Sequence, residues 1–531
     1  MSQTNVSESF DIFDRISKYY VSRITGHSLI APEAIQISVT NKCNLRCTMC
    51  RLNKLKDKRE LTSPQIRSLI KQARRIGIKQ LFLTGGEPFL NKDLPQIIKE
   101  NNDRYICITT NGTLVDKTLA KKLVDIRLSA LVISMDGAKP ETHDKIRGVK
   151  GCFELTLNGI KNIISERKRR GSKTPRIIIS YTIINENCGE LFDFLLLAAK
   201  VGIDEVHFHP LLVTPQFMKK IEDTKNELWV KKESLKALDS ALEKLIELKK
   251  SKDEKISKLI GNSLENLELI KKYFGSERTP AMGCYKTFKT IEITPENSIF
   301  LCADRVGDLS KKSIEEMLHS DELALERKKL KQCKHHCLHY CATIAAYDLF
   351  ENPLQKTAER LLAAVDSALM SDFKTNRAEC VIAISGAIQT ITTLSFLLNQ
   401  YADDIDSGKE ARGAIKEFAE IKEKFEKKLE DALNLSSASA SEHKTSRDGK
   451  ICPEVKSDRI YARQIKELQR QIKELQRQIN AFRDSRVKSD RTYARRIKEL
   501  QSEIDEFRGS RGYRYILSPL DKTYKAIFRK K

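Results

Sequence analysis

Three cysteines stand close together near the start of the chain, in the segment SVTNKCNLRCTMC. Cys43, Cys47 and Cys50 form the pattern C-x3-C-x2-C. Thiolates are the usual ligands of iron–sulfur clusters, and a [4Fe–4S] cluster normally takes four of them. Zinc is the structural alternative, but three thiolates without a nearby fourth Cys or His fit a closed zinc site poorly. The spacing therefore predicts a [4Fe–4S] cluster in which one iron is left open for a chelating small molecule.

Further polar motifs follow at intervals. Gly85-Gly86-Glu87-Pro88 combines glycines, which permit close backbone approach, with a carboxylate that can meet an ammonium. Asn111 lies in a Thr-Asn-Gly segment, which by itself often makes only a turn. Each motif taken alone has such a plain structural explanation.

Two further sites offer groups for a polar ligand. Ser134 and Asp136 carry a hydroxyl and a carboxylate that suit ribose hydroxyls. Arg147 could pair with a carboxylate through two hydrogen bonds, although a surface ion pair would use the same residue.

These motifs must be positioned by a repeating pattern of strands and helices. Six β-rich runs alternate with helical patterns, at 34–39, 79–84, 105–110, 130–135, 176–184 and 204–209. The first intervening helix is expected to begin with Ser63 as its N-cap and Pro64 in its first turn. Six β–α units predict a parallel sheet with outer helices, too few for a closed eight-stranded barrel. The motifs all follow strands, where ligands bind in such folds.

Taken together, the cysteine loop, the GGEP turn and their order resemble the radical S-adenosylmethionine (SAM) enzymes over about residues 31–345. The resemblance implies that the open iron binds the amino and carboxylate groups of SAM. It also implies reductive cleavage to methionine and a 5′-deoxyadenosyl radical that abstracts hydrogen from substrate. Residues implied to contact SAM are Gly85, Gly86, Glu87, Asn111, Ser134, Asp136, Arg147 and Asn185. His207 and His209 share one face of the sixth strand and either touch substrate or fill the sheet.

A second group of five cysteines lies further along, at Cys284, Cys302, Cys333, Cys337 and Cys341. Its opening resembles the SPASM or twitch module of the same family, with Asn297 where the family usually has Gly. FKTIEITPENSIFLC also reads as a hairpin. The closing spacing departs from the two-cluster pattern, so we expect one auxiliary [4Fe–4S] cluster. A zinc site that uses His335 or His336 is the alternative.

The remaining segments complete an α/β chain: a partial (βα)6 barrel, then an auxiliary-cluster module, a helical bundle and a C-terminal coiled coil. The repeats VKSDRIYARQIKELQ and VKSDRTYARRIKELQ place apolar residues at heptad spacing. The predicted order is an N-terminal helical extension (1–30), the barrel (31–215), a helical connector (216–278), the auxiliary module (279–345), a bundle (346–435) with helices at 354–373, 376–404 and 408–435, a linker (436–454), coiled-coil repeats (455–510) and a basic aromatic tail (511–531).

The distribution of charged and apolar residues limits the kinds of partner that we expect for the C-terminal part of the chain. Residues 451–531 hold 22 Lys and Arg against 11 Asp and Glu, and the tail mixes aromatic residues with cations. This favours an anionic membrane surface over a solvated tail and, last, nucleic acid. The uncharged run from Cys380 to Tyr401 is too polar for a membrane span and predicts a buried bundle helix.

The start has no secretory signal pattern, so we expect a cytoplasmic protein. The basic tail would allow it to associate with the inner face of the membrane. The expected partners are a low-potential electron donor, a small-molecule or peptide substrate, and a second coiled-coil helix. A coiled-coil assembly factor with a regulatory iron–sulfur domain is the competing function.

Overall fold

The computed structural model describes residues 5–50, 52, 55–211, 227–251, 253–275, 285–301, 304–331, 353–371, 373–399, 401–402 and 408–442. The chain divides into two compact units, residues 1–435 and 436–531. All elements discussed below belong to the first unit, except that helix α18 continues past residue 435. The predicted coiled coil and basic tail lie outside the described residues.

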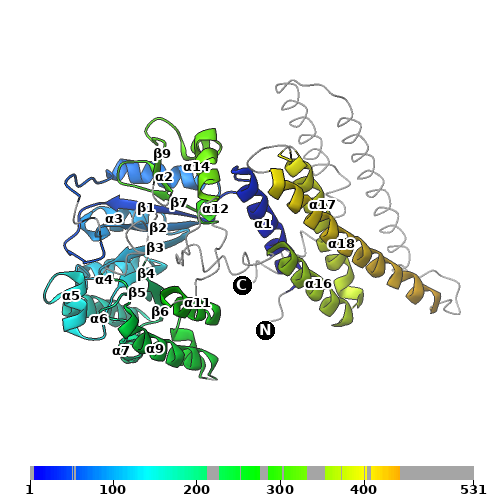
Figure 1. Ribbon diagram of the computed structural model, residues 1–531. Helices are drawn as coiled ribbons and strands as arrows, with labels where there is room; N and C mark the ends of the chain where they lie inside the picture. Colours follow the sequence, from blue (N-terminus) through cyan, green and yellow to red (C-terminus); the bar gives the residue numbers. More distant parts are fainter. Residues whose placement is uncertain are drawn as a thin grey trace. The chain divides into compact units, whose positions relative to one another are not determined.

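The six predicted strands form one curved parallel sheet in sequential order (Figure 1). Its register joins Ile37 to Leu83, Leu83 to Ile108 and Ile108 to Leu131, and these four side chains are fully or almost fully buried. The strands are β1 (Ala34–Thr40), β2 (Gln80–Gly85), β3 (Tyr105–Thr110), β4 (Ala130–Ser134), β5 (Arg176–Ile183) and β6 (Glu205–Pro210). The partial (βα)6 barrel is therefore confirmed.

Helices connect these strands and cover the outer face of the sheet (Figure 1). They are α2 (Ser63–Arg75), α3 (Leu94–Lys99), α4 (Lys117–Asp125), α5 (Pro140–Arg147), α6 (Cys152–Arg170) and α7 (Leu191–Val201). The prediction that Ser63 caps α2 is wrong by one residue. Thr62 is the N-cap, and it forms a reciprocal capping box with Gln65. The Ser63 hydroxyl instead donates to Asp93, at 2.6 Å.

The sheet extends beyond the barrel on the β1 side. Strand β7 (Thr290–Ile293) pairs in parallel with β1, and β8 (Ile299–Leu301) and β9 (Asp304–Val306) follow it as antiparallel strands. The predicted hairpin is present, and Asn297 adopts the left-handed conformation at its turn, with φ of 59°. This hairpin joins the barrel sheet directly, which the sequence pattern did not indicate.

The opposite edge of the sheet is closed by a helical segment that follows the barrel. Ile260 bridges to Val206 of β6, and the Asn262 amide bonds both the N–H and the carbonyl of Phe208, each at 2.8 Å. A buried amide thus satisfies backbone groups that an exposed edge strand would leave open. The helices of this segment are α9 (Lys232–Lys250), α10 (Glu254–Leu259) and α11 (Leu264–Phe274).

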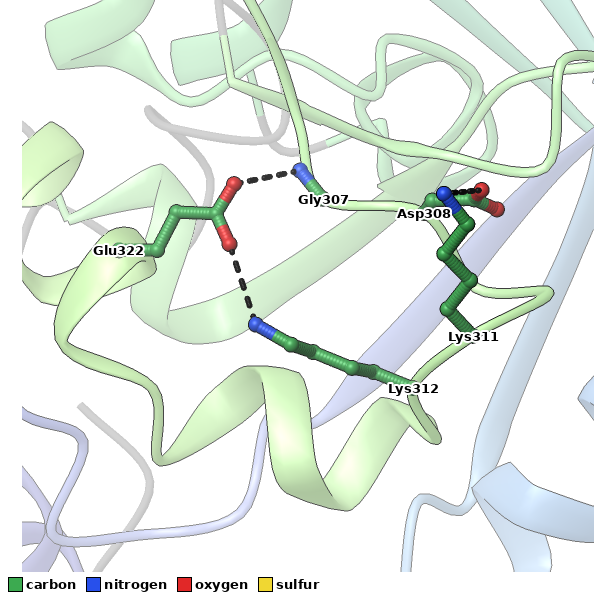
Figure 2. Close-up of a pocket in the computed structure, with 5 residues that line it drawn as sticks. All are labelled: Gly307, Asp308, Lys311, Lys312 and Glu322. Atoms are coloured by element: carbon green, nitrogen blue, oxygen red, sulfur yellow. Dashed lines mark hydrogen bonds and ion pairs between the residues drawn. The ribbon is translucent and has the colours of Figure 1, made fainter.

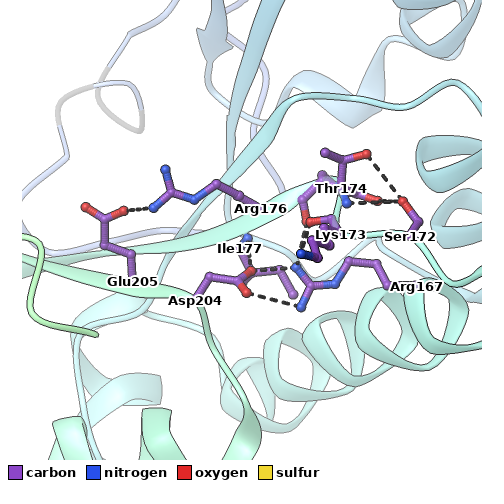
Figure 3. A network of polar contacts seen from close by, with 9 residues as sticks. Arg167, Ser172, Lys173, Thr174, Arg176, Ile177, Asp204 and Glu205 are labelled. Carbon is purple, nitrogen blue, oxygen red and sulfur yellow. Dashed lines mark hydrogen bonds and ion pairs between the residues drawn. The ribbon is translucent and has the colours of Figure 1, made fainter. Parts of the chain in front are cut away.

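A polar network fixes β5 and β6 where these two strands begin (Figure 3). Arg167 of α6 donates to Asp204 at 2.5 Å and to the carbonyl of Pro175 at 3.0 Å. Asp204 also accepts from the N–H of Ile177, at 2.7 Å, and Arg176 pairs with Glu205. Because these contacts lie at the amino-terminal ends of the strands, they stabilise the sheet at the end away from the predicted ligand site.

The N-terminal helix packs with the helices that follow the auxiliary module, so the predicted extension at 1–30 is part of the bundle. Phe13 stacks edge-on against Phe425 with ring centroids 5.3 Å apart, and Thr390 donates to Asp14 at 2.7 Å. The helices are α1 (Val6–Thr25), α16 (Pro353–Ser371), α17 (Phe373–Asn399) and α18 (Gly408–Glu442). Helix α18 continues past its predicted end at residue 435.

Helix α17 contains a stretch, Glu379–Asn399, that is long and apolar enough to cross a membrane. Its buried face includes Ile384, Ile391 and Leu398, which contribute to the bundle core. The exposed positions in the middle of this stretch are mostly polar, with Ser385, Gln389 and Thr393 among them. This division into an apolar and a polar face matches a bundle helix in contact with water.

A pair of substitutions separates a bundle helix from a membrane span. Ile391→Asp places an unpaired carboxylate in the core and should destabilise the bundle by about 3 kcal/mol or more. Thr393→Asp lies on the exposed face and should cost no more than about 1 kcal/mol. Thermal unfolding of the two full-length variants measures the difference. Equal losses would contradict this account, because a membrane-spanning helix disfavours Asp at both positions.

Candidate active site

The cysteine loop follows β1 and is held by the end of α5. The N–H groups of Arg46 and Thr48 donate to the carbonyls of Arg147 and Ile146, at 3.1 and 2.9 Å. The last carbonyls of a helix have no partner within the helix, so they are free to accept these bonds. The loop backbone is therefore anchored on both sides of Cys47.

Gly148 makes this contact sterically possible. It ends α5 in the left-handed conformation, with φ of 71°. A Cβ atom at this position would lie 2.3 Å from the carbonyl oxygen of Arg46. Sequence reasoning could have identified Gly148 as a helix C-cap but not its approach to the cysteine loop.

The GGEP turn supports the segment that leads into the loop. The N–H of Gly86 donates to the carbonyl of Thr40 at 2.7 Å, and the N–H of Glu87 to that of Lys42 at 2.8 Å. A Cβ atom on Gly86 would lie 2.0 Å from the Lys42 oxygen, and one on Gly85 would lie 2.4 Å from the Thr40 oxygen. Both glycines are thus required for this close backbone contact.

The Glu87 side chain points into the protein. Its carboxylate is fully buried and accepts from the Thr110 hydroxyl at 2.7 Å and from the N–H groups of Asn111 and Phe89, at 2.8 and 3.1 Å. Burial raises the pKa of Glu87 above its usual value, although these three hydrogen bonds act in the opposite direction. Glu87 therefore ties β2 to β3.

Asn111 connects the end of β3 to the cysteine loop. Its amide nitrogen donates to the Asn44 side chain at 2.8 Å and lies 4.0 Å from the Cys43 sulfur. Its oxygen accepts from the N–H of Thr113 at 2.9 Å, which fixes the orientation of the amide.

The three thiols of the loop are partly exposed and influence one another. Burial raises the pKa of both Cys43 and Cys47, and neighbouring thiols add to the effect. Among the described residues no three His, Cys, Asp or Glu side chains converge on a point that could hold a single ion. In a [4Fe–4S] cluster each thiolate binds a different iron, so such convergence is not needed. Three accessible thiols on one anchored loop fit the cluster.

A buried ion pair lies directly beside the loop. Arg147 contacts Asp136 at 2.6 Å, and a second guanidinium nitrogen lies 3.7 Å from the Cys47 sulfur. Burial alone would lower the pKa of Arg147, but Asp136 and Cys47 outweigh it, so this pKa lies above its ordinary value. Asp136 has no solvent exposure and also accepts from the N–H of Thr182 at 2.7 Å. Its carboxylate thus faces Arg147 and the backbone, not an open ribose site.

The other two predicted SAM contacts, Ser134 and Asn185, differ in how far the protein itself occupies their polar groups. Ser134 ends β4 half-buried on the inner face of the sheet. The Asn185 oxygen accepts from the N–H of Lys231 at 2.9 Å, so this amide holds the connector segment. Asn187, which is not among the predicted contacts, is fully buried two residues further on, and its amide nitrogen donates to the carbonyls of Asp136 and Thr182.

His207 and His209 lie on the inner face of β6. The intervening Phe208 packs with Tyr181 on the helix side, so the two imidazoles must point the other way. Their rings stack with centroids 6.0 Å apart, and His207 contacts Glu205 at 2.6 Å. Burial, followed by the neighbouring His207, lowers the pKa of His209 to about 3, so His209 is neutral near pH 7.

The five late cysteines, from Cys284 to Cys341, lie outside the described residues, as do His335 and His336. Within the predicted range of this module, a surface depression is lined by Gly307, Asp308, Lys311, Lys312 and Glu322 (Figure 2). Glu322 accepts from the N–H of Gly307 at 3.2 Å and pairs with Lys312 at 3.4 Å. Asp308 pairs with Lys311 at 3.8 Å. The charged side chains that line the depression therefore pair with one another.

Comparison with known proteins identifies the family of this fold. Residues 37–195 match the model of the radical SAM superfamily. A probable GTP 3′,8-cyclase of Saccharolobus solfataricus is 31% identical over 214 residues, which are 39% of this chain and 67% of that protein. Fe-coproporphyrin III synthase of Methanosarcina barkeri is 30% identical over 237 residues, 44% of this chain and 56% of that protein. The chain thus spans little more than half the length of several curated relatives.

A solved structure of similar arrangement is Streptococcus suis SuiB bound to the precursor peptide SuiA. It has a TM-score of 0.42 and 15% sequence identity, and the match covers 55% of this chain and 66% of SuiB. At this level the likeness adds nothing to the family assignment. The sequence matches and the parallel (βα)6 sheet show that this chain belongs to the radical SAM superfamily, whose members are enzymes that use a [4Fe–4S] cluster and SAM.

Proposed function

We propose that Cys43, Cys47 and Cys50 bind the catalytic [4Fe–4S] cluster and that SAM binds at its open iron. The observation that carries this proposal is the anchoring of the cysteine loop by three separate elements, the α5 carbonyls, the GGEP turn and Asn111. When bound, the cluster supplies one electron that cleaves SAM to methionine and a 5′-deoxyadenosyl radical. The protein positions the thiols and leaves their sulfur atoms accessible.

The substrate of the radical binds, in our proposal, over the inner face of the sheet next to β6. This face carries hydroxyl groups from Ser134, Ser180 and Thr182, and beside them the stacked His207 and His209. Hydroxyls and the neutral imidazole of His209 both donate and accept hydrogen bonds. They favour a polar substrate, of which peptides and sugar-type metabolites are the classes we expect. The curated relatives have names as different as Fe-coproporphyrin III synthase and GTP 3′,8-cyclase, so their names do not select one.

We further propose one auxiliary [4Fe–4S] cluster, held by four of Cys284, Cys302, Cys333, Cys337 and Cys341. The described part of this module supports the resemblance, because the β7–β8 hairpin and the left-handed Asn297 occupy the places that the module's opening predicts. Association of the basic tail, residues 511–531, with an anionic membrane stays a prediction from its sequence alone.

The central assay follows SAM cleavage in the full chain. Anaerobically reconstituted protein with a low-potential reductant should release 5′-deoxyadenosine from SAM. Replacement of Cys43, Cys47 and Cys50 by alanine should abolish this release, because the cluster that binds SAM would lose its three thiolate ligands. Chromatography of the products provides the measurement, and cleavage at the wild-type rate in the triple variant would sink the assignment.

Metal analysis of the same triple variant tests the auxiliary cluster. The variant should retain about four irons per chain, the content of one [4Fe–4S] cluster. Zinc in place of iron, or protein free of metal, would overturn this part of the proposal and leave the first part intact.

A matched pair of glycine variants tests whether the anchored loop is needed for cluster assembly. Gly148→Ala and Gly77→Ala both place a side chain at positive φ, 71° and 81°. Only the first brings its Cβ close to the cysteine loop, since nothing lies within 4 Å of the second. Both should lose about 1 kcal/mol of stability from backbone strain.

Gly148→Ala should in addition lower the iron content of the loop cluster several-fold, as measured by iron analysis and by the absorbance of the reconstituted protein. Equal iron contents in the two variants would show that the contact between Gly148 and Arg46 does not shape the site.

A further inference from the structure

The side chain of Arg147 lies between the carboxylate of Asp136 and the sulfur of Cys47. One guanidinium nitrogen contacts the carboxylate of Asp136 at 2.6 Å, and another donates toward the sulfur of Cys47 at 3.7 Å. Arg147 is 8% exposed and Asp136 is 0% exposed. Charges that are shielded from water act on one another more strongly than charges on a surface. The pair is therefore placed to influence the charge on the Cys47 sulfur.

The surrounding contacts hold this pair in place. The N–H of Asp136 donates to the Nδ1 atom of His143 at 3.2 Å, and its carbonyl accepts from Asn187 at 2.9 Å. The Asp136 carboxylate also accepts from the N–H of Thr182. Arg147 in turn accepts through its own carbonyl from the N–H of Arg46. The cation is thus fixed to the cysteine loop by its backbone as well as by its side chain.

From this geometry we infer that Arg147 raises the reduction potential of the cluster on Cys43, Cys47 and Cys50, and that Asp136 limits the increase. The inference rests on the proposed assignment of these cysteines. Reduction adds one electron to the cluster from a low-potential one-electron donor, and no bond forms or breaks. Hydrogen bonds to the cluster sulfurs and nearby positive charge stabilise the reduced form. The guanidinium of Arg147 keeps its positive charge at any pH used for the measurement. The negative charge of the Asp136 carboxylate, in contrast, disfavours the reduced cluster.

A different role for Arg147 is to bind the carboxylate of SAM, as the family resemblance implies. Its Nε atom has no hydrogen-bond partner among the described residues, so one donor remains for such a contact. The two roles differ in one measurable respect. A carboxylate contact changes the affinity for SAM, whereas an effect on Cys47 changes the potential of the cluster when SAM is absent.

The test is an anaerobic redox titration of the full-length protein without SAM, followed by electron paramagnetic resonance. The loop cluster is recognised as the signal that changes when SAM is added to a reduced sample. Arg147→Gln should make reduction at least about tenfold less favourable, a shift of about 59 mV to lower potential for a one-electron couple. Asp136→Asn should shift the potential to higher values, because it removes the opposing charge. Lys145→Gln is the matched control, since this exposed cation lies on the same helix as Arg147 and pairs with Glu186, and it should leave the potential unchanged.

Opposite shifts in the two variants support the inference, because a purely structural disturbance would not reverse its sign between them. Unchanged potentials, or shifts in the same direction, overturn it. If the Arg147→Gln protein does not assemble the cluster, the potentials of the Arg147→Lys and Asp136→Asn proteins test the inference instead. The lysine variant should then remain within about tenfold of the wild type, and Asp136→Asn must still shift upward. A wild-type protein without a SAM-responsive signal would instead refute the proposed function itself.

Discussion

The site depends on one constraint, that the carboxyl ends of parallel strands meet at the same edge of a sheet. The cysteine loop leaves β1, the GGEP turn leaves β2, Asn111 follows β3, and Asp136 follows β4. Because these ends are adjacent, backbone groups from one connection can bind those of the next. The carbonyls of Thr40 and Lys42 accept from the GGEP turn in this way. These backbone bonds shape the loop that carries the thiols.

The carboxylates of Glu87 and Asp136 at this edge of the sheet form contacts within the protein. Glu87 is fully buried and holds β3, and Asp136 is fully buried and holds Arg147. Buried carboxylates are costly unless they are paired and hydrogen-bonded, and both of these are. The Nε atom of Arg147 is buried and has no hydrogen-bond partner among the described residues, so it stays available to a ligand of the proposed cluster site.

Much of this architecture could be predicted from the sequence, because it follows from local patterns. The apolar runs in the sequence predicted all six barrel strands, and the turn residues predicted the hairpin at Asn297. Contacts between distant segments could not be predicted. Nothing in the local pattern shows that β7 pairs with β1, or that α1 packs against Phe425 of α18. The inward orientation of Glu87 and Asp136 was missed for the same reason, since their partners, Asn111 and Arg147, are set by tertiary packing.

The central claim is that the cluster on Cys43, Cys47 and Cys50 binds SAM at its open iron. The most direct measurement is electron–nuclear double resonance on the reduced wild-type protein with SAM that carries a ¹⁵N label in its amino group. The account predicts a ¹⁵N coupling to the cluster spin, as expected for a nitrogen bound to iron. A reduced, SAM-saturated sample in which the cluster spin shows no coupling to this nitrogen would contradict it.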